Sequence, residues 1–142
     1  MNKNIKIFGF ADEASPMIDE QIKAMKRNGL AGLEIRNVDN TWIASVTPEK
    51  AREVRAKLDD AGLVTWAIGS SVGKMDIEKD DFAAHFEMLK RMIEIAHILG
   101  SENLRGFSFF IPKDKNPADY KNEVIDRIGT MLDIMKGSGV TF

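Results

Sequence analysis

The polar residues that could bind a ligand follow the apolar segments of this sequence. Gly69, Ser70 and Ser71 come directly after the apolar run 63–68, and Lys74 follows in the same loop. An apolar run that ends in glycine and serine is typical of the carboxyl end of a buried parallel strand, where α/β folds bind ligands. Lys74 would offer a positive charge to a phosphate or a sugar oxygen. The same pattern also fits an ordinary turn with a solvated lysine, since glycine and serine mark most turns.

Two charged residues interrupt apolar runs, where an unpaired charge is costly to bury. Glu34 lies within the run 30–36, and Arg105 within the run 104–111. Glu34 could act as a catalytic carboxylate, or it could pair with Arg36 or with an arginine of a neighbouring strand. Arg105 could contact a ligand carboxylate or phosphate through two nitrogen atoms, or it could be the partner of Glu34. The sequence leaves both alternatives open for each residue.

Ser108, two acidic residues and two histidines are weaker candidates. Ser108 lies late in the fourth apolar run, and Asp12 and Glu13 follow the first, where exposed acidic residues are common. His85 and His97 fall in one predicted helix, too far apart to share a metal ion at one-turn spacing, so we expect structural roles for both. The chain has no cysteine, which excludes a disulfide framework and a thiolate metal site.

The scaffold that must position these residues follows from the pattern of apolar residues. Four apolar runs predict strands, and each is followed by an amphipathic segment that predicts a helix. The predicted strands span residues 5–10, 30–36, 63–68 and 104–111. Residues 140–142 look like the first residues of a fifth strand.

The predicted helices begin at capping residues. In three places a side chain suited to the N-cap precedes a proline, which is favoured at the first helical position. These pairs are Ser15-Pro16, Thr47-Pro48 and Asn116-Pro117. The remaining helix is predicted to begin near Asp80 or Asp81, whose negative charge suits a helix N-terminus.

Alternating apolar strands and amphipathic helices indicate a parallel sheet covered by helices. Either an open doubly wound sheet or part of a (β/α)8 barrel fits this alternation. A dinucleotide-binding fold should carry a Gly-x-Gly-x-x-Gly turn after its first strand, and residues 9–14 lack it. The sequence therefore disfavours a dinucleotide site but leaves a flavodoxin-like or receiver-like sheet open.

The composition is that of one globular domain, which we expect to span residues 1–142. The chain is 44% hydrophobic and 30% charged, with a net charge of −2. This charge gives no general attraction to nucleic acid or to an anionic membrane. The apolar run within residues 1–10 is too short for a signal peptide or a membrane span, so we expect a cytoplasmic protein.

Several short motifs occur in order at the ends of successive predicted strands. They lie at residues 10–14, 32–36, 67–70 with 73–74, and 104–109. Together they resemble the N-terminal half of the sugar phosphate isomerase/epimerase family, the xylose isomerase-like TIM barrels. The resemblance implies a partial (β/α)8 barrel of about four βα units plus the start of a fifth strand. Ser71 departs from the family, which often carries proline there.

The resemblance also implies an activity. It predicts a divalent-metal-dependent isomerase or epimerase that acts on a sugar or sugar phosphate by removing a proton next to a carbonyl. Mn, Mg, Co or Zn would serve the full barrel, but its principal ligands follow from the fifth strand onward, so we expect this chain to lack most of them. Glu34 is the expected catalytic residue. The expected substrate-binding residues are Lys74, Ser70, Arg105, Ser108 and Arg36.

About half a barrel would leave unpaired strand edges and an apolar concave face. We therefore expect either a C-terminal half that this sequence lacks or self-association, and little turnover from this chain alone. A non-catalytic half-barrel serving as an assembly or binding subunit is the alternative. An endonuclease of the same superfamily, acting at abasic sites, is disfavoured because no histidine falls at a strand end and the net charge is negative.

Overall fold

The computed structural model describes residues 5–142, so the first four residues of the predicted domain and of the segment 1–10 lie outside the described part. A four-stranded parallel sheet is its centre, in the order β1-β2-β5-β6. The strands are β1 (Phe8–Phe10), β2 (Gly32–Ile35), β5 (Val64–Gly69) and β6 (Leu104–Arg105). Spatial order thus follows chain order, as in a (β/α)8 barrel and unlike a doubly wound sheet.

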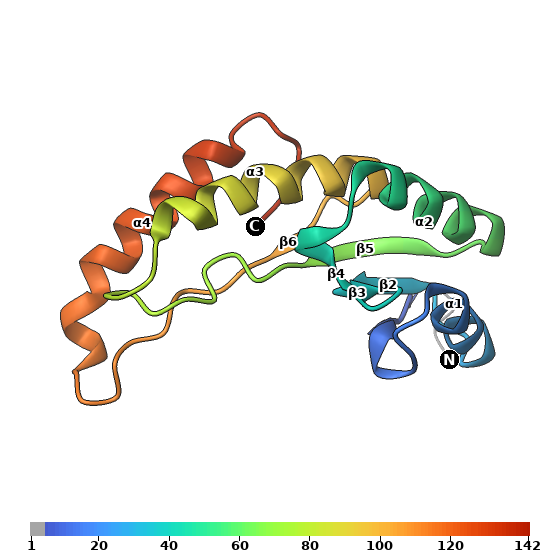
Figure 1. The fold of residues 1–142 in the computed structure, drawn as a ribbon, viewed down its shortest axis with the longest axis horizontal. Helices are drawn as coiled ribbons and strands as arrows, with labels where there is room; N and C mark the ends of the chain where they lie inside the picture. Colours follow the sequence, from blue (N-terminus) through green and yellow to red (C-terminus); the bar gives the residue numbers. More distant parts are fainter. Residues whose placement is uncertain (1–4) are drawn as a thin grey trace.

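Helices follow one another along the outside of the sheet. The long ones are α1 (Ile18–Arg27), α2 (Pro48–Ala61), α3 (Phe82–Leu99) and α4 (Lys121–Met135). Figure 1 shows α4, α3 and α2 along the outer side of an open arc, with β5 and β6 beneath them and α1 near one end. No helix within residues 5–142 is both long and apolar enough to cross a membrane.

Short elements complete the described chain. They are η1 (Ala11–Glu13), the hairpin of β3 (Asn37–Val38) and β4 (Thr41–Trp42), η2 (Ile43–Ser45) and η3 (Pro117–Tyr120). The hairpin and η2 together fill the connection between β2 and α2, at the carboxyl end of the sheet.

The core lies between the helices and the outer face of the sheet. Leu33 and Ile35 of β2 are both buried against it, and because side chains alternate along a strand, Glu34 between them points to the opposite face. That inner face remains open in part: Phe10 is 43% exposed and Trp66 is 48% exposed. The sheet therefore has one packed face and one face that carries both charges and exposed aromatic rings.

An irregularity in β5 sets the register of the site. Leu33 pairs with Thr65 but Glu34 pairs with Ala67, so Trp66 is the extra residue of a β-bulge. The freed carbonyl of Trp66 accepts hydrogen bonds from Ser101 Oγ at 3.1 Å and Asn103 Nδ2 at 2.9 Å.

Most of the predicted helix starts are confirmed. Thr47 accepts a hydrogen bond from the Lys50 amide, Asp81 caps α3, and Asn116 caps η3, which runs on into α4. The start at Ser15-Pro16 is wrong, because α1 begins at Ile18. The amide of Ile18 donates to Asp39 Oδ1 at 2.9 Å, so a residue of the hairpin takes the capping role.

The fourth strand is shorter than predicted. It ends at Arg105, because the amides of Phe107 and Phe110 donate to carbonyls of the loop after β5 (those of Val72 and Met75), and Phe109 adopts a left-handed φ of 75°. The predicted start of a fifth strand does lie beside β6: the Leu104 amide donates to the Thr141 carbonyl at 2.8 Å in an isolated parallel bridge.

Candidate functional site

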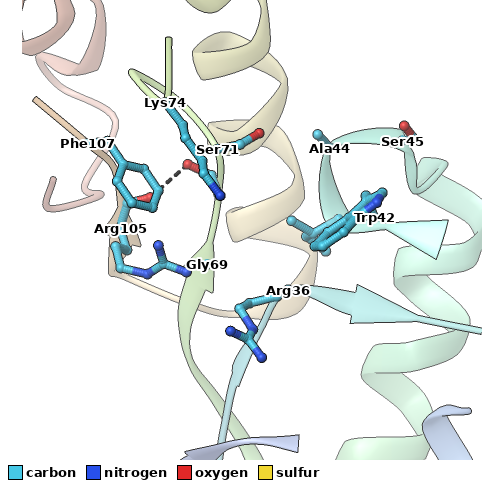
Figure 2. Close-up of a pocket in the computed structure, with 11 residues that line it drawn as sticks. Arg36, Trp42, Ala44, Ser45, Gly69, Ser71, Lys74, Arg105 and Phe107 are labelled. Atoms are coloured by element: carbon cyan, nitrogen blue, oxygen red, sulfur yellow. Dashed lines mark hydrogen bonds between the residues drawn. The ribbon is translucent and has the colours of Figure 1, made fainter. Parts of the chain in front are cut away.

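A cavity of about 470 Å³ opens at the carboxyl ends of β2, β5 and β6 (Figure 2). It is lined by Arg36, Trp42, Ile43, Ala44, Ser45, Gly69, Ser70, Ser71, Lys74, Arg105 and Phe107. Parallel strands bring these segments together because all their carboxyl ends meet at one edge. Four of the predicted substrate-binding residues, Lys74, Ser70, Arg105 and Arg36, therefore lie around one cavity.

Lys74 is the cation of the cavity that stays available to a ligand. Its side chain is exposed, and within residues 5–142 it has no ion-pair partner. The ammonium nitrogen lies 5.6 Å from the centre of the Phe107 ring, a contact that an exposed cation–π pair makes weakly. Lys74 can thus turn to an anionic or hydroxyl oxygen without breaking an ion pair.

Arg36 is already paired with two carboxylates of η1. Its Nε and Nη2 donate to Asp12, with Nη2 at 2.9 Å from Oδ1, and Nη2 also reaches Glu13 at 2.5 Å. The guanidinium carbon lies 4.3 Å from the centre of the Phe10 ring. The hydrogen bonds to Asp12, followed by those to Glu13, raise the pKa of Arg36. Arg36 therefore forms a fixed, charged wall of the cavity.

Glu34 and Arg105 meet across the sheet. Arg105 Nε donates to Glu34 Oε1 at 2.5 Å, and only 14% of the Glu34 side chain is exposed. A Cβ atom at Gly69 would lie 2.6 Å from Arg36 Cγ and 2.9 Å from Glu34 Oε1, so any larger residue there would force these side chains to move. Of the alternatives open in the sequence, the ion pair of Glu34 with Arg105 forms. Glu34 itself does not line the cavity, and its catalytic role stays a prediction.

The two predicted serines lie in different places. Ser70 is buried, and its hydroxyl donates to the Arg105 carbonyl at 2.7 Å and accepts from the Val72 amide at 3.2 Å. It ties the loops after β5 and β6 together at the floor of the cavity. Ser108 is exposed and outside the lining, because the chain leaves the sheet after Arg105.

Trp42 is a cavity residue that sequence reasoning missed. It is 66% exposed and projects over the cavity from the β3–β4 hairpin (Figure 2). Asp39 and Asn40 form the turn with positive φ angles of 48° and 62°, which these residues tolerate better than most. The Asp39-Asn40 pair was the available signal for a hairpin turn.

The carboxylates of the site do not fit a divalent metal ion. Within residues 5–142, no group of three or more histidine, aspartate or glutamate side chains could hold one. Asp12 and Glu13 are bound to Arg36, and Glu34 to Arg105.

Known proteins share this architecture. The family described as xylose isomerase-like TIM barrel matches residues 22–142, and no curated protein matches the sequence. A solved xylose isomerase domain protein from Planctomyces limnophilus is similar with a TM-score of 0.69 at 16% identity, over 99% of this chain and 54% of its own. D-psicose 3-epimerase, solved in the presence of D-fructose, is similar with a TM-score of 0.71 at 16% identity, over 96% of this chain and 50% of its own. The IolI protein, solved with a bound zinc atom, is similar with a TM-score of 0.68 at 16% identity, over 96% of this chain and 50% of its own.

The chain spans about half the length of these solved structures. At such low identity the similarity shows the fold alone. It confirms the predicted fold class, part of a (β/α)8 barrel in which successive βα units stand side by side.

Proposed function

Because this chain belongs to the xylose isomerase-like TIM barrel family, we propose that its cavity binds a sugar or sugar phosphate for isomerisation or epimerisation. The observation that carries the proposal is one cavity that combines the available cation of Lys74 with the aromatic rings of Trp42 and Phe107. Sugar rings present apolar C–H faces, which pack on aromatic rings, and hydroxyl or phosphate oxygens, which accept from cations.

Each lining residue has a role in this proposal. Trp42 covers one face of the sugar, and Lys74 donates to a phosphate or hydroxyl oxygen. Arg105 and Arg36 orient other oxygens with the guanidinium N–H groups that their carboxylate partners leave free. Ser70 keeps the two loops together and so fixes the cavity floor.

Glu34 is our candidate for the catalytic carboxylate that accepts a proton next to the carbonyl. A general base must present a carboxylate oxygen to the substrate, and Glu34 lies on the inner face of the sheet, where its Oε1 accepts from Arg105 Nε at 2.5 Å. A ligand anion that binds Arg105, which already lines the cavity, would compete with Glu34 for the guanidinium and so free the carboxylate for this role.

The solved neighbours suggest which ligands to test. D-psicose 3-epimerase was solved in the presence of D-fructose, and IolI with zinc. We propose that a complete barrel uses a divalent metal, such as Mn, Mg, Co or Zn, as a Lewis acid, held by residues outside 5–142. In this proposal residues 1–142 form one domain that binds and orients the sugar. This domain alone has little catalytic activity.

A titration of the 142-residue chain tests the proposal. D-fructose, D-psicose and D-fructose 6-phosphate are added while Trp42 fluorescence and amide chemical shifts are followed, with Trp66→Phe as the background. We expect saturable binding that weakens about tenfold or more in Lys74→Met, since about one charge-assisted hydrogen bond is lost. The matched control is Lys79→Met, an exposed lysine of the same connection outside the cavity.

Two results would contradict the proposal. A folded chain that binds none of the three sugars would contradict sugar binding. Binding that neither Lys74→Met nor Trp42→Ala weakens would show that the sugar does not bind in this cavity.

A second candidate function is a non-catalytic assembly or binding subunit. The exposed inner face of the sheet, with Phe10, Val64 and Trp66, favours it. The endonuclease alternative has no such support, since both histidines lie on α3 and neither lines the cavity.

A further inference from the structure

The loop that presents Lys74 is held by a histidine of the following helix. The amide of Gly73 donates a hydrogen bond to His85 Nδ1 at 3.0 Å. Gly73 directly precedes Lys74 in the loop, and His85 lies in the first turns of α3. Because the backbone amide can only donate, Nδ1 must carry a lone pair, and the imidazole is neutral with its proton on Nε2.

Gly73 is fixed on its other sides as well. Its carbonyl accepts from the Phe109 amide at 3.2 Å, and its φ is 75°. A Cβ atom there would lie 2.0 Å from the Phe107 carbonyl oxygen, so the loop packs directly on the segment after β6. Among residues 5–142, the imidazole of His85 is thus the side chain that binds the amide of Gly73.

We propose that His85 is a positioning residue for the cavity: its neutral ring holds Gly73 so that Lys74 faces the ligand, and protonation of the ring releases the loop. A protonated imidazole has a donor at both nitrogens, so Nδ1–H would oppose the Gly73 N–H. The effect of His85 on sugar binding rests on the proposed function. The hydrogen bond by which His85 holds the loop is independent of that function.

Two carboxylates act on His85. Asp80 and Asp81 come directly before α3, and both favour the protonated form of the ring. Partial burial of the ring is the largest influence, and it lowers the pKa of His85 below its ordinary 6.5. The neutral ring that the hydrogen bond from the Gly73 amide requires is therefore also the form that burial favours, and protonation needs a pH below that of an ordinary histidine.

Histidine NMR tests the hold on the loop directly. The chain has two histidines, so a His97→Asn variant assigns both imidazole signals. We expect His85 to be the Nε2–H tautomer at pH 7.5 and to titrate below 6.5. The amide signals of Gly73 and Lys74 should move with the same pKa. A doubly protonated His85 at pH 7.5 would overturn the proposal. Gly73 and Lys74 amide signals that do not change as His85 titrates would overturn it as well.

Two substitutions separate positioning from packing. His85→Asn keeps an acceptor near the position of Nδ1 but cannot titrate, so the Gly73 amide should keep its shift and lose its pH dependence. His85→Leu fills similar space without an acceptor and should shift the Gly73 amide at every pH. His97→Asn, on the same helix but bonded to the Ser138 carbonyl, is the matched control and should leave Gly73 unchanged.

Sugar affinity gives the functional readout. With D-psicose as the probe, we expect roughly tenfold weaker binding one pH unit below the pKa of His85, since about a tenth of the chains then keep the neutral ring. His85→Asn should abolish this pH dependence. Equal pH dependence in wild type and His85→Asn would overturn the positioning role. If no sugar binds but the Gly73 and Lys74 amides follow the His85 titration, the hold on the loop is supported and the proposed ligand is wrong.

Discussion

The pair of Glu34 and Arg105 is the ion pair that joins two strands across the site. Removing either partner leaves the other charge poorly solvated, so we expect Glu34→Ala or Arg105→Ala to lower the free energy of unfolding by about 2 kcal/mol. A double-mutant cycle in urea should give a coupling of about 1–2 kcal/mol. The exposed pair of Lys90 and Glu87 on α3 is the control and should couple by less than about 0.5 kcal/mol. Equal coupling in both cycles would show that Glu34 and Arg105 are only loosely paired.

The sequence allowed this pair to be anticipated only in part. A carboxylate and a guanidinium inside apolar runs must form an ion pair or bind a ligand, and the sequence predicted these two alternatives for Glu34 and Arg105. The choice between Arg36 and Arg105 for Glu34 required the strand order and the close approach that Gly69 permits. His85 was expected to be structural, and its bond to Gly73 was beyond reach because it depends on how a loop folds back onto a helix.

Among the elements, the β3–β4 hairpin carries Trp42 and is held mainly by Asp39. This side chain accepts from the Ile18 amide at 2.9 Å and pairs with Lys50 of α2 at 2.5 Å. The hydrogen bond to Lys50 is the main reason that the pKa of Asp39 lies below its ordinary value. One residue thus joins the hairpin to the start of α1 and to α2.

Substitution of Asp39 should separate these contributions. Asp39→Ala loses the cap of α1, the ion pair and a residue that tolerates positive φ, so we expect about 2 kcal/mol of destabilisation in urea unfolding. Asp39→Asn keeps the acceptor and the tolerance of positive φ and should cost about 0.5 kcal/mol. If both variants lose the same stability, charge rather than backbone geometry holds the hairpin.

The same contacts explain which elements the sequence predicted. Thr47 and Asp81 cap their own helices within three residues, so a local pattern was sufficient. The start of α1 was misplaced because its cap, Asp39, comes from a distant part of the chain. Residues 106–111 have an apolar pattern that suits a strand, but the amides of Phe107, Phe109 and Phe110 donate to carbonyls of the loop after β5. This contact is tertiary, so a local pattern does not reveal it.

At the scale of the whole molecule, repetition of one unit made the fold predictable. Four strand–helix units of similar length can form few kinds of sheet. Parallel strands are joined by right-handed crossover connections, and the helices of these connections cover one face of the sheet. The arc in Figure 1 follows from that rule, with helices outside and strands inside. The other face of the sheet is where the sequence predicted a need for a partner.

That face supports a last prediction, self-association of the isolated chain. Val64 is 51% exposed, and Trp66, which stacks on Phe8 with ring centres 5.7 Å apart, is 48% exposed. Clustered apolar side chains of this kind favour contact with a second surface. Light scattering should therefore show mass that rises with concentration, and Val64→Lys should reduce it, because a charge would have to be desolvated in the contact. Leu132→Lys, at a 50% exposed position on α4, should leave the association unchanged. A monomer at every concentration would contradict self-association, and loss of association in Leu132→Lys alone would place the contact on the helices instead of the sheet.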